Sequence, residues 1–374
     1  MKTESFADSL NPESLWLYNK IKQVGVSKWN QSVIDHWFST REGPMPRRYL
    51  LSVDSGGIRG IIPAVALIKL EKMTGKLTRD IFSFVAGTST GAIIATAIAA
   101  GVPATRILDL YVHRTRALFT RYPWTLLKRI LFGYMYPTQS LYDLIADSID
   151  PVHSWTLNDS PINILLTAKR ISDGMPWYFV RDNPKNSGCT GRLGIVDCAT
   201  ASAAAPTYFQ PWTIAEASTP PNCEVVGSLV DGGTGVTGNP VYQACVEAFY
   251  YTADYTPEET ITVSLGTGRF PYRKKPRWIG AWLEWVLNEL LESPGEQQTE
   301  ITQRHFPQMI FYRIDTELKK DIGLDDTHHI DELVEYGERL ADTIDWDAIL
   351  AGTATPSRIG PHNTLWEEYR IKVK

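Results

Sequence analysis

The segment IFSFVAGTSTGAIIATAIAAG, Ile81–Gly101, decides the fold of this chain. Its first six residues, 81–86, form an apolar run that is long enough for a buried parallel strand. Residues 92–100 are small and apolar, and they predict a helix that packs closely against its neighbours. Gly101 then ends this helix. The segment therefore predicts a strand and a helix joined by a very short turn.

The turn between them, Gly87-Thr88-Ser89-Thr90-Gly91, matches the pattern G-x-S-x-G. A strand that runs through this pattern into a helix forms a nucleophile elbow. Gly87 and Gly91 lack a Cβ atom and let strand and helix approach each other. Ser89 is then expected at the helix N-terminus, where the helix dipole favours a developing alkoxide. An ordinary strand–helix turn is the alternative, because the bare pattern is common by chance.

A second glycine-rich turn precedes the elbow. Tyr49–Val53 predicts a strand, Asp54-Ser55-Gly56-Gly57-Ile58-Arg59-Gly60 follows it, and an apolar helix begins at Ile61. Successive backbone N–H groups in such a turn form an anion site at a helix start. The oxyanion of an acyl-transfer intermediate is one candidate occupant. A phosphate is the weaker alternative, because G-x-x-x-x-G-K-[ST] is absent and the match to G-x-G-x-x-G fails at Ser55.

The third feature is Leu229-Val230-Asp231-Gly232-Gly233, an aspartate at the end of a predicted strand. Alone, Asp-Gly-Gly usually marks a turn. In this order, however, Asp54–Gly60, Gly87–Gly91 and Asp231–Gly233 resemble the three motifs of the patatin-like phospholipases. The resemblance covers about Arg47 to Gly268 well and extends weakly to Leu340. Further segments that fit are Thr200–Phe209, Ile261–Gly268 and Asp321–Asp326.

The resemblance implies an α/β, patatin-like three-layer fold with a central, mostly parallel sheet, a nucleophile elbow and extra helices at both ends. It implies a lipid acyl hydrolase of the phospholipase A type, which uses a Ser-Asp dyad and an acyl-serine intermediate and needs no metal or cofactor. By family match Ser89 is the nucleophile and Asp231 its base. The implied oxyanion hole consists of the backbone N–H groups of Gly56, Gly57, Ile58 and Arg59. The residues expected to support the motifs are Asp54, Ser55, Gly60, Gly87, Gly91, Gly232 and Gly233.

Two positions depart from the family pattern. Ser55 stands where the family usually has glycine, which is costly if the backbone there needs a positive φ. The loop after Asp231 is lengthened by Thr234–Gly238 before Asn239-Pro240. These departures leave open an alternative in which the protein is a catalytically weakened module that binds a lipid or a nucleotide.

A Ser-His-Asp esterase is the enzymatic alternative. In an α/β hydrolase the catalytic residues follow the order Ser, Asp, His. The downstream candidates for the histidine are His305, His328, His329 and His362. None of them stands in a sequence context that singles it out.

Composition limits the function classes. The chain has 374 residues, of which 43% are hydrophobic and 21% charged, as in a large globular protein. The net charge of −5 gives no overall attraction to nucleic acid, so no nucleic-acid partner is expected. The four cysteines show no zinc spacing and are expected to be reduced thiols. Without an apolar leader or a run of ~18 apolar residues, a cytoplasmic protein with peripheral membrane contact is expected.

The expected domain organisation has three parts. Residues 1–45 predict an N-terminal helical extension, residues 46–270 the patatin-like catalytic domain, and residues 271–374 a mainly helical part that completes or covers it. The sequence does not determine the oligomeric state.

Two segments mix basic and aromatic residues, Arg114–Tyr136 and Arg269–Leu291. The first fits a membrane interface, an anionic ligand, or simply packed helices whose aromatic residues are buried and whose charges are solvated. The second predicts a Trp-rich helix at 278–292, which fits an interfacial anchor or acyl-site lid, or a buried helix. Some bacterial members of the resembled family are switched on by a cyclic nucleotide and hydrolyse membrane phospholipids in antiphage defence. The expected partners are therefore a phospholipid or other lipid ester, the membrane surface, and a cyclic nucleotide as a candidate activator.

Overall fold

The computed structural model describes residues 48–120, 131, 133–183, 189–214, 227–252, 254–269, 275–277, 282 and 294–357. The chain divides into two units, Met1–Arg47 and Arg48–Lys374. The predicted N-terminal extension lies outside the described residues, as does most of the predicted Trp-rich helix at 278–292.

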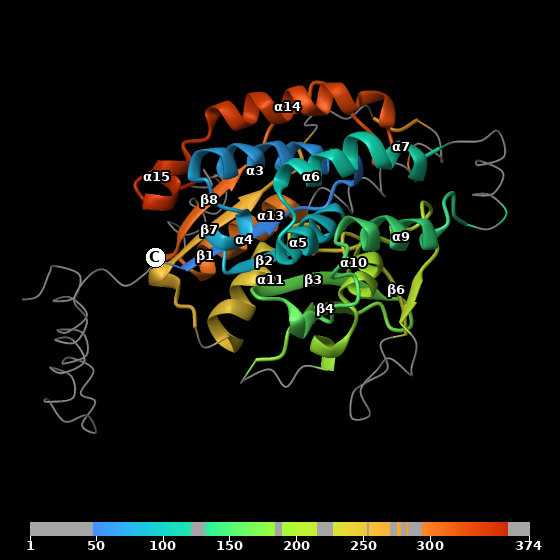
Figure 1. Cartoon of the computed structure of the whole chain (residues 1–374), viewed down its shortest axis with the longest axis horizontal. Helices are drawn as coiled ribbons and strands as arrows, with labels where there is room; N and C mark the ends of the chain where they lie inside the picture. Colours follow the sequence, from blue (N-terminus) through green and yellow to red (C-terminus); the bar gives the residue numbers. More distant parts are fainter. Residues whose placement is uncertain are drawn as a thin grey trace, which may run out of the picture. The chain divides into compact units, whose positions relative to one another are not determined.

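The second unit contains one sheet of eight strands, in the order β5-β6-β3-β2-β1-β7-β8, with β4 also paired to β3 (Figure 1). The strands are β1 (Arg48–Val53), β2 (Phe84–Thr88), β3 (Asn163–Arg170), β4 (Pro176–Val180), β5 (Trp212–Ile214), β6 (Gly227–Asp231), β7 (Thr260–Leu265) and β8 (Ile310–Ile314). Strands β1, β2, β3, β7 and β8 pair in parallel, whereas β4, β5 and β6 pair antiparallel. The prediction of a mostly parallel sheet is confirmed.

Helices cover the sheet and connect its strands. The α-helices are α3 (Ile61–Thr74), α4 (Thr78–Ile81), α5 (Thr90–Ala100), α6 (Ala104–Asp109), α7 (Thr115–Leu118), α9 (Thr138–Ser148), α10 (Ile195–Ala203), α11 (Val241–Val246), α13 (Pro294–His305), α14 (Ile330–Thr343) and α15 (Trp346–Ala351). Short π-helices span Leu110–Arg114 and Glu247–Tyr251, and 3-10 helices span Gly57–Gly60, Leu157–Asp159, Cys189–Arg192, Pro257–Glu259 and Thr327–His329.

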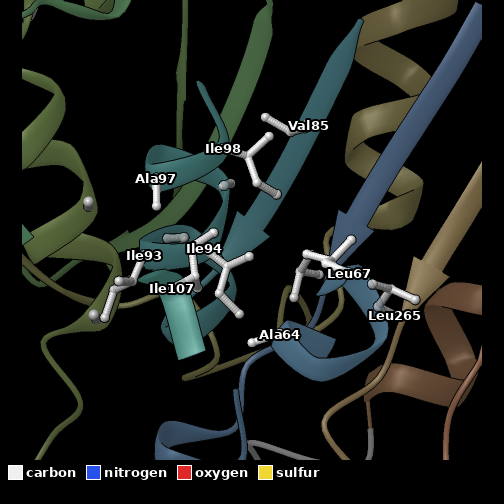
Figure 2. Packing of buried hydrophobic residues seen from close by; sticks show 14 of the residues in the cluster. Ala64, Leu67, Val85, Ile93, Ile94, Ala97, Ile98, Ile107 and Leu265 are labelled. Atoms are coloured by element: carbon white, nitrogen blue, oxygen red, sulfur yellow. The ribbon is translucent and has the colours of Figure 1, made fainter. Parts of the chain in front are cut away.

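Two hydrophobic cores lie on opposite faces of the sheet, because successive side chains of a strand point to opposite sides. In β1, Leu51 and Val53 belong to the larger core with helices α3, α5, α10 and α14. Leu50 belongs to the smaller core with α11. The side chains of α5 gather with those of α3 and β2 in the larger core (Figure 2). The result is the predicted three-layer arrangement.

Local signals set the ends of the elements around the site. Helix α3 ends at Gly75 and α5 at Gly101, and both glycines have the left-handed φ that a helix C-terminus favours, 66° and 80°. Strands β3 and β4 form a hairpin, in whose turn Gly174 has a φ of 70°. Among the described residues, no helix is long and apolar enough to cross a membrane.

Candidate active site

Ser89 occupies a strained turn between β2 and α5. Its φ is 55° and its ψ is −121°, a backbone conformation that a residue with a side chain rarely adopts. It is also the N-cap residue of α5, as predicted, and its side chain is almost fully buried. Such strain costs of order 1–3 kcal/mol and persists only where the surrounding structure imposes it.

The two glycines of the elbow are needed because backbones meet there. A Cβ atom on Gly87 would lie 2.1 Å from the carbonyl oxygen of Gly91. A Cβ atom on Gly91 would lie 2.1 Å from the carbonyl oxygen of Val53, in the neighbouring strand β1. Real Cβ atoms do not approach backbone this closely, so the glycines fix how β2 enters α5.

Strand β3 brings Asp231 to the end of β2. Thr167 of β3 pairs with Thr88, the last residue of β2, and the next residue, Ala168, pairs with Asp231, the last residue of β6. Because β4 occupies the other edge of β3, β2 and β6 lie end to end along the same edge. Asp231 therefore meets Ser89 where the two strand ends converge.

Burial changes the acid–base behaviour of Asp231, which is 1% exposed. Removal from water raises the pKa of its carboxyl group to about 7, while the Ser89 hydroxyl and the Gly233 N–H, 2.7 Å from Oδ1, lower it. The Ser89 hydroxyl is near enough to lower the pKa of Asp231, but Oδ2 of Asp231 makes no hydrogen bond within the described chain. Catalytic hydrogen bonds are often long before substrate binds. A carboxylate with this pKa can accept a proton near neutral pH.

Helix α10 holds both residues from the side. The Ser89 N–H donates to Oγ of Ser202 at 3.0 Å, and the Asp231 N–H donates to the carbonyl oxygen of Ala204 at 3.0 Å. Thr200–Phe209 is one of the segments that fit the family pattern, but that pattern does not single out Ser202. The available signal was a serine in an alanine-rich run that also contains Thr200.

The predicted oxyanion loop begins at the end of β1. Gly57 has a left-handed φ of 57°, and a Cβ atom there would lie 2.4 Å from the carbonyl oxygen of Leu324. That carbonyl accepts the Ile58 N–H at 2.9 Å, and Gly56 accepts the Arg59 N–H at 3.1 Å. The N–H groups of Gly56 and Gly57 make no hydrogen bond with the part of the chain that the structure describes. Of the four predicted amides, these two are therefore available to an oxyanion.

Ser55 fits this loop without the predicted strain. Positive φ values occur, among the described residues other than glycine, at Ser89 and Thr207. Ser55 is thus in a conformation that any residue adopts, and its carbonyl accepts the Thr267 hydroxyl at 2.6 Å.

An ion pair between Arg313 and Asp54 holds the first residue of the oxyanion loop. The guanidinium of Arg313 donates to both carboxylate oxygens of Asp54, at 3.0 and 2.7 Å, and also contacts Asp315 at 3.1 Å. Burial raises the pKa of Asp54 to about 6, although Arg313 lowers it. No motif singles out Arg313, which lies 259 residues from Asp54.

An apolar cavity opens beside Ser89. Its walls include Ile93, Leu118, Phe119 and Phe209. Apolar side chains dominate its walls, so it suits a hydrocarbon chain better than a polar ligand. Tyr111 also lines it and shares a very short hydrogen bond with the hydroxyl of Thr90, the residue after Ser89.

The described histidines lie apart from this site. His305 contacts the hydroxyl groups of Tyr242 and Tyr250, and His329 pairs with Asp326. No hydrogen bond or ion pair joins any histidine of the described segments to Ser89 or Asp231. His362 lies outside the described residues. No group of three or more potential metal ligands occurs within those segments either.

Residues 51–244 match the model of the family "Patatin-like phospholipase". The chain belongs to this family. The family consists of lipid acyl hydrolases, so the prediction of a hydrolytic enzyme is confirmed at that level. The chain is 26% identical over 306 residues to a cGAMP-activated phospholipase of Escherichia coli strain TW11681, covering 77% of this chain and 81% of that protein.

Two further comparisons are more distant. A cGAMP-activated phospholipase of Vibrio cholerae is 26% identical over 258 residues, which cover 62% of this chain and 70% of that protein. The solved structure of human GIVD cytosolic phospholipase A2 covers 92% of this chain and 64% of its own, with 12% identity and a TM-score of 0.42. That structural similarity is too low to support a conclusion.

The basic and aromatic segment 114–136 is described in part. Tyr136 is 2% exposed and packs edge-on against Phe119, with a centroid distance of 5.3 Å. Its hydroxyl donates to Oδ2 of Asp325 at 2.6 Å. These aromatic side chains are packed, as in the simplest of the three interpretations, while residues 121–130 lie outside the described part.

Proposed function

We propose that this protein hydrolyses carboxylic esters of membrane phospholipids, as a phospholipase of the A type, through a Ser-Asp dyad and an acyl-serine intermediate. One observation carries the proposal. Ser89, on a strained elbow, faces the buried carboxylate of Asp231, whose pKa is about 7, and both Ser89 and the free amide of Gly57 line an apolar cavity.

The first half of the reaction forms an acyl-serine. Asp231 accepts the hydroxyl proton of Ser89 while Oγ attacks the ester carbonyl carbon. The N–H groups of Gly56 and Gly57 donate to the oxyanion of the tetrahedral intermediate. Asp231 then returns its proton to the leaving alkoxide, so the lysophospholipid departs as an alcohol.

The second half releases the fatty acid. A water molecule loses a proton to Asp231 and attacks the acyl-serine carbonyl. Collapse of the second tetrahedral intermediate returns this proton to Oγ of Ser89, which restores the free enzyme. A base with a pKa near the operating pH serves both halves, because it must take up and release the proton.

Lipid substrates fit the site better than small polar esters. The cavity beside Ser89 offers apolar walls such as Phe119 and Phe209 to an acyl chain. Each methylene group that leaves water contributes about 0.8 kcal/mol. We place the protein in the cytoplasm, in peripheral contact with the membrane that supplies its substrate. Residues 46–270 form the proposed catalytic domain, which residues 271–374 complete.

We also propose that a cyclic nucleotide activates the protein. The support comes from two relatives, of E. coli and V. cholerae, which are cGAMP-activated phospholipases. At 26% identity, this similarity supports a cyclic dinucleotide as the class of activator, but it does not identify the bases of that nucleotide.

The alternatives receive less support. A catalytically weakened module would tolerate loss of Ser89 or Asp231, yet both are present and adjacent. Ser55 also has no positive φ, so this departure from the family pattern does not strain the loop. A Ser-His-Asp esterase needs a histidine beside the serine, and the candidates His305 and His329 pair with other side chains.

The test is fatty-acid release from mixed phospholipid vesicles, with and without added cyclic dinucleotides. Wild type is compared with Ser89→Ala, Asp231→Asn and His305→Ala. The proposal expects release by wild type and His305→Ala and by neither active-site variant. Release that persists in Asp231→Asn but disappears in a histidine variant would replace the dyad by a triad. Equal release with and without nucleotide would remove the activator from the proposal.

A further inference from the structure

The lengthened loop after Asp231 contains a buried tripeptide, Thr237-Gly238-Asn239, which we call the tie segment. Thr237 is 2% exposed and Asn239 is 0% exposed. Such burial is unexpected in a loop, since loops usually run over the surface. The carbonyl groups of Thr237 and Gly238 and the hydroxyl of Thr237 bond to the three motifs, and the side chain of Asn239 bonds to the elements around them.

Its first contact is with the oxyanion loop. The Ser55 N–H donates to the carbonyl oxygen of Gly238 at 2.8 Å. Ser55 directly precedes Gly56 and Gly57, whose N–H groups are the available oxyanion donors. The two departures from the family pattern, Ser55 and the lengthened loop, are therefore in direct contact.

Its second contact is with the elbow. The hydroxyl of Thr88, the residue before Ser89, donates to the carbonyl oxygen of Thr237 at 2.6 Å. Thr88 also shares a hydrogen bond of 2.7 Å with the Thr167 hydroxyl. Because a hydroxyl has one proton, Thr167 must be the donor in this second bond. A directed chain thus runs from β3 through β2 to the tie segment.

Its third contact is with the aspartate turn. The hydroxyl of Thr237 donates to the carbonyl oxygen of Gly232, the residue after Asp231, at 2.6 Å. Gly232 itself is tightly placed, because a Cβ atom there would lie 2.2 Å from Oγ1 of Thr167. The bond from Thr237 therefore closes the turn that carries the proposed base.

Asn239 anchors the tie segment to the body of the domain. Its Oδ1 accepts the N–H of Val241 at 3.0 Å, and its Nδ2 donates to the carbonyl oxygen of Gly295 and to Oγ1 of Thr299, both at 3.2 Å. Its side chain also reaches Ser52 in β1 at 3.4 Å. These bonds hold the tie segment in place, so it can in turn hold the motifs that it contacts.

We propose that the tie segment is a positioning element that sets the spacing of Ser89, Asp231 and the Gly56–Gly57 amides, with Thr237 as its central positioning residue. The inference rests on the proposed function of those groups. The three motifs end strands β1, β2 and β6, and the tie segment bonds to all three. An error of about 1 Å in such a constellation costs of order a hundredfold in rate.

The experiment compares Thr237→Val with Thr237→Ser in steady-state hydrolysis of a soluble p-nitrophenyl fatty-acid ester. Valine keeps the shape of threonine and removes the bond to Gly232, so kcat should fall ten- to a hundredfold while KM changes less than threefold. Serine keeps the hydroxyl and should restore kcat to within threefold of wild type. The control is Thr96→Val on α5, a buried threonine whose hydroxyl has no partner in the described chain; its kcat should equal that of wild type.

A purely structural role would change other quantities. If Thr237→Val lowers Tm but leaves kcat per folded molecule within twofold of wild type, the positioning role is refuted. If Thr237→Val does not fold, Thr88→Val removes the bond to the Thr237 carbonyl and should show the same loss of kcat; an unchanged kcat refutes the role.

Failure of the proposed function gives a different result. Wild type would then neither hydrolyse the ester nor react with a fluorophosphonate at Ser89, and the positioning role would be refuted together with it. If wild type reacts at Ser89 and Thr237→Val reacts equally fast, only the positioning role is refuted.

Discussion

The nucleophile elbow and the oxyanion loop end neighbouring parallel strands, yet they are held in different ways. The elbow is fixed by close backbone contacts at Gly87 and Gly91. These contacts lie within the motif itself and with the adjacent strand β1. The oxyanion loop is fixed by groups that arrive from distant segments, among them Gly238, Thr267 and Leu324. The first is a local steric device, and the second is a tertiary assembly.

This difference determines how each region responds to change. At the elbow, one added methyl group is enough to prevent the turn. At the oxyanion loop, each support contributes a fraction, and loss of one leaves the others in place. Four predictions sharpen or break this comparison, from the largest effect to the smallest.

The largest effect is expected for Gly91→Ala. The new Cβ atom would lie 2.1 Å from the Val53 carbonyl oxygen, so β1, β2 and α5 cannot keep their packing. We expect at least a thousandfold loss of ester hydrolysis together with a fall in Tm. Gly323→Ala is the control, because its Cβ atom would meet nothing closer than 3.9 Å and its φ is not positive. Normal activity in Gly91→Ala would show that the elbow is not sterically fixed.

An intermediate effect is expected for Arg313→Lys. Lysine supplies one point charge and cannot donate to both oxygens of Asp54. We expect a loss of stability of roughly 1–3 kcal/mol and a tenfold fall in kcat/KM. The control is Arg339→Lys, since Arg339 pairs with Glu335 on the exposed face of α14 and should change stability by less than about 0.5 kcal/mol. If both variants behave alike, the ion pair does not support the loop.

The pH dependence separates activity from stability. Asp231 and Asp54 have folded pKa values of about 7 and about 6, above the ordinary 3.8. As pH rises from about 4 to 7, the unfolded chain loses these protons first, so the free energy of unfolding falls. Hydrolysis needs ionised Asp231 and therefore rises with pH through about 7. Urea unfolding at several pH values should show that Asp231→Asn gains stability relative to wild type, by at most roughly 1.4 kcal/mol for each pH unit.

A pH-independent stability difference between Asp231→Asn and wild type would contradict the raised pKa. An acid limb of hydrolysis below pH 5 would contradict it as well, because Asp231 would then ionise as an ordinary carboxyl group.

The smallest effect is a gain of stability in Ser89→Gly. Glycine relieves the strain at a φ of 55°, worth about 1–3 kcal/mol, against an entropic cost of about 0.5–1 kcal/mol. We expect a net gain of roughly 1 kcal/mol in urea unfolding. Ser89→Ala is the matched control, because it keeps a Cβ atom and hence the strain. Equal stability of the two variants would mean that the elbow stores no strain at Ser89.

The elbow was predictable from sequence because its determinants are adjacent. Gly87, Ser89 and Gly91 stand within one motif, and the flanking apolar runs define the strand and helix around it. The role of Asp231 was predictable only because its motif follows the other two in the family order, since an aspartate before two glycines usually marks a turn. Asp231 lies beside Ser89 because Thr167 pairs with the end of β2 and the next residue, Ala168, pairs with the end of β6.

The supports of the oxyanion loop were not predictable. Arg313 stands in no motif. Leu324 lies in the family-matching segment Asp321–Asp326 and Gly238 in the lengthened loop, but only the fold brings these residues to Asp54–Gly60. The Leu324 carbonyl oxygen accepts a hydrogen bond from the Ile58 N–H, which the family resemblance places in the oxyanion hole. Backbone hydrogen bonds of this kind leave no mark on residue identity, so no reading of residue types reveals them.

The central claim is that Asp231 activates Ser89. Its most direct test is the rate at which a fluorophosphonate modifies Ser89, followed by peptide mass mapping across pH in wild type and Asp231→Asn. We predict modification of Ser89 alone, with a rate that rises through a pKa of about 7 and falls at least a hundredfold in Asp231→Asn. An undiminished rate in Asp231→Asn, or modification of a different serine, would contradict the claim.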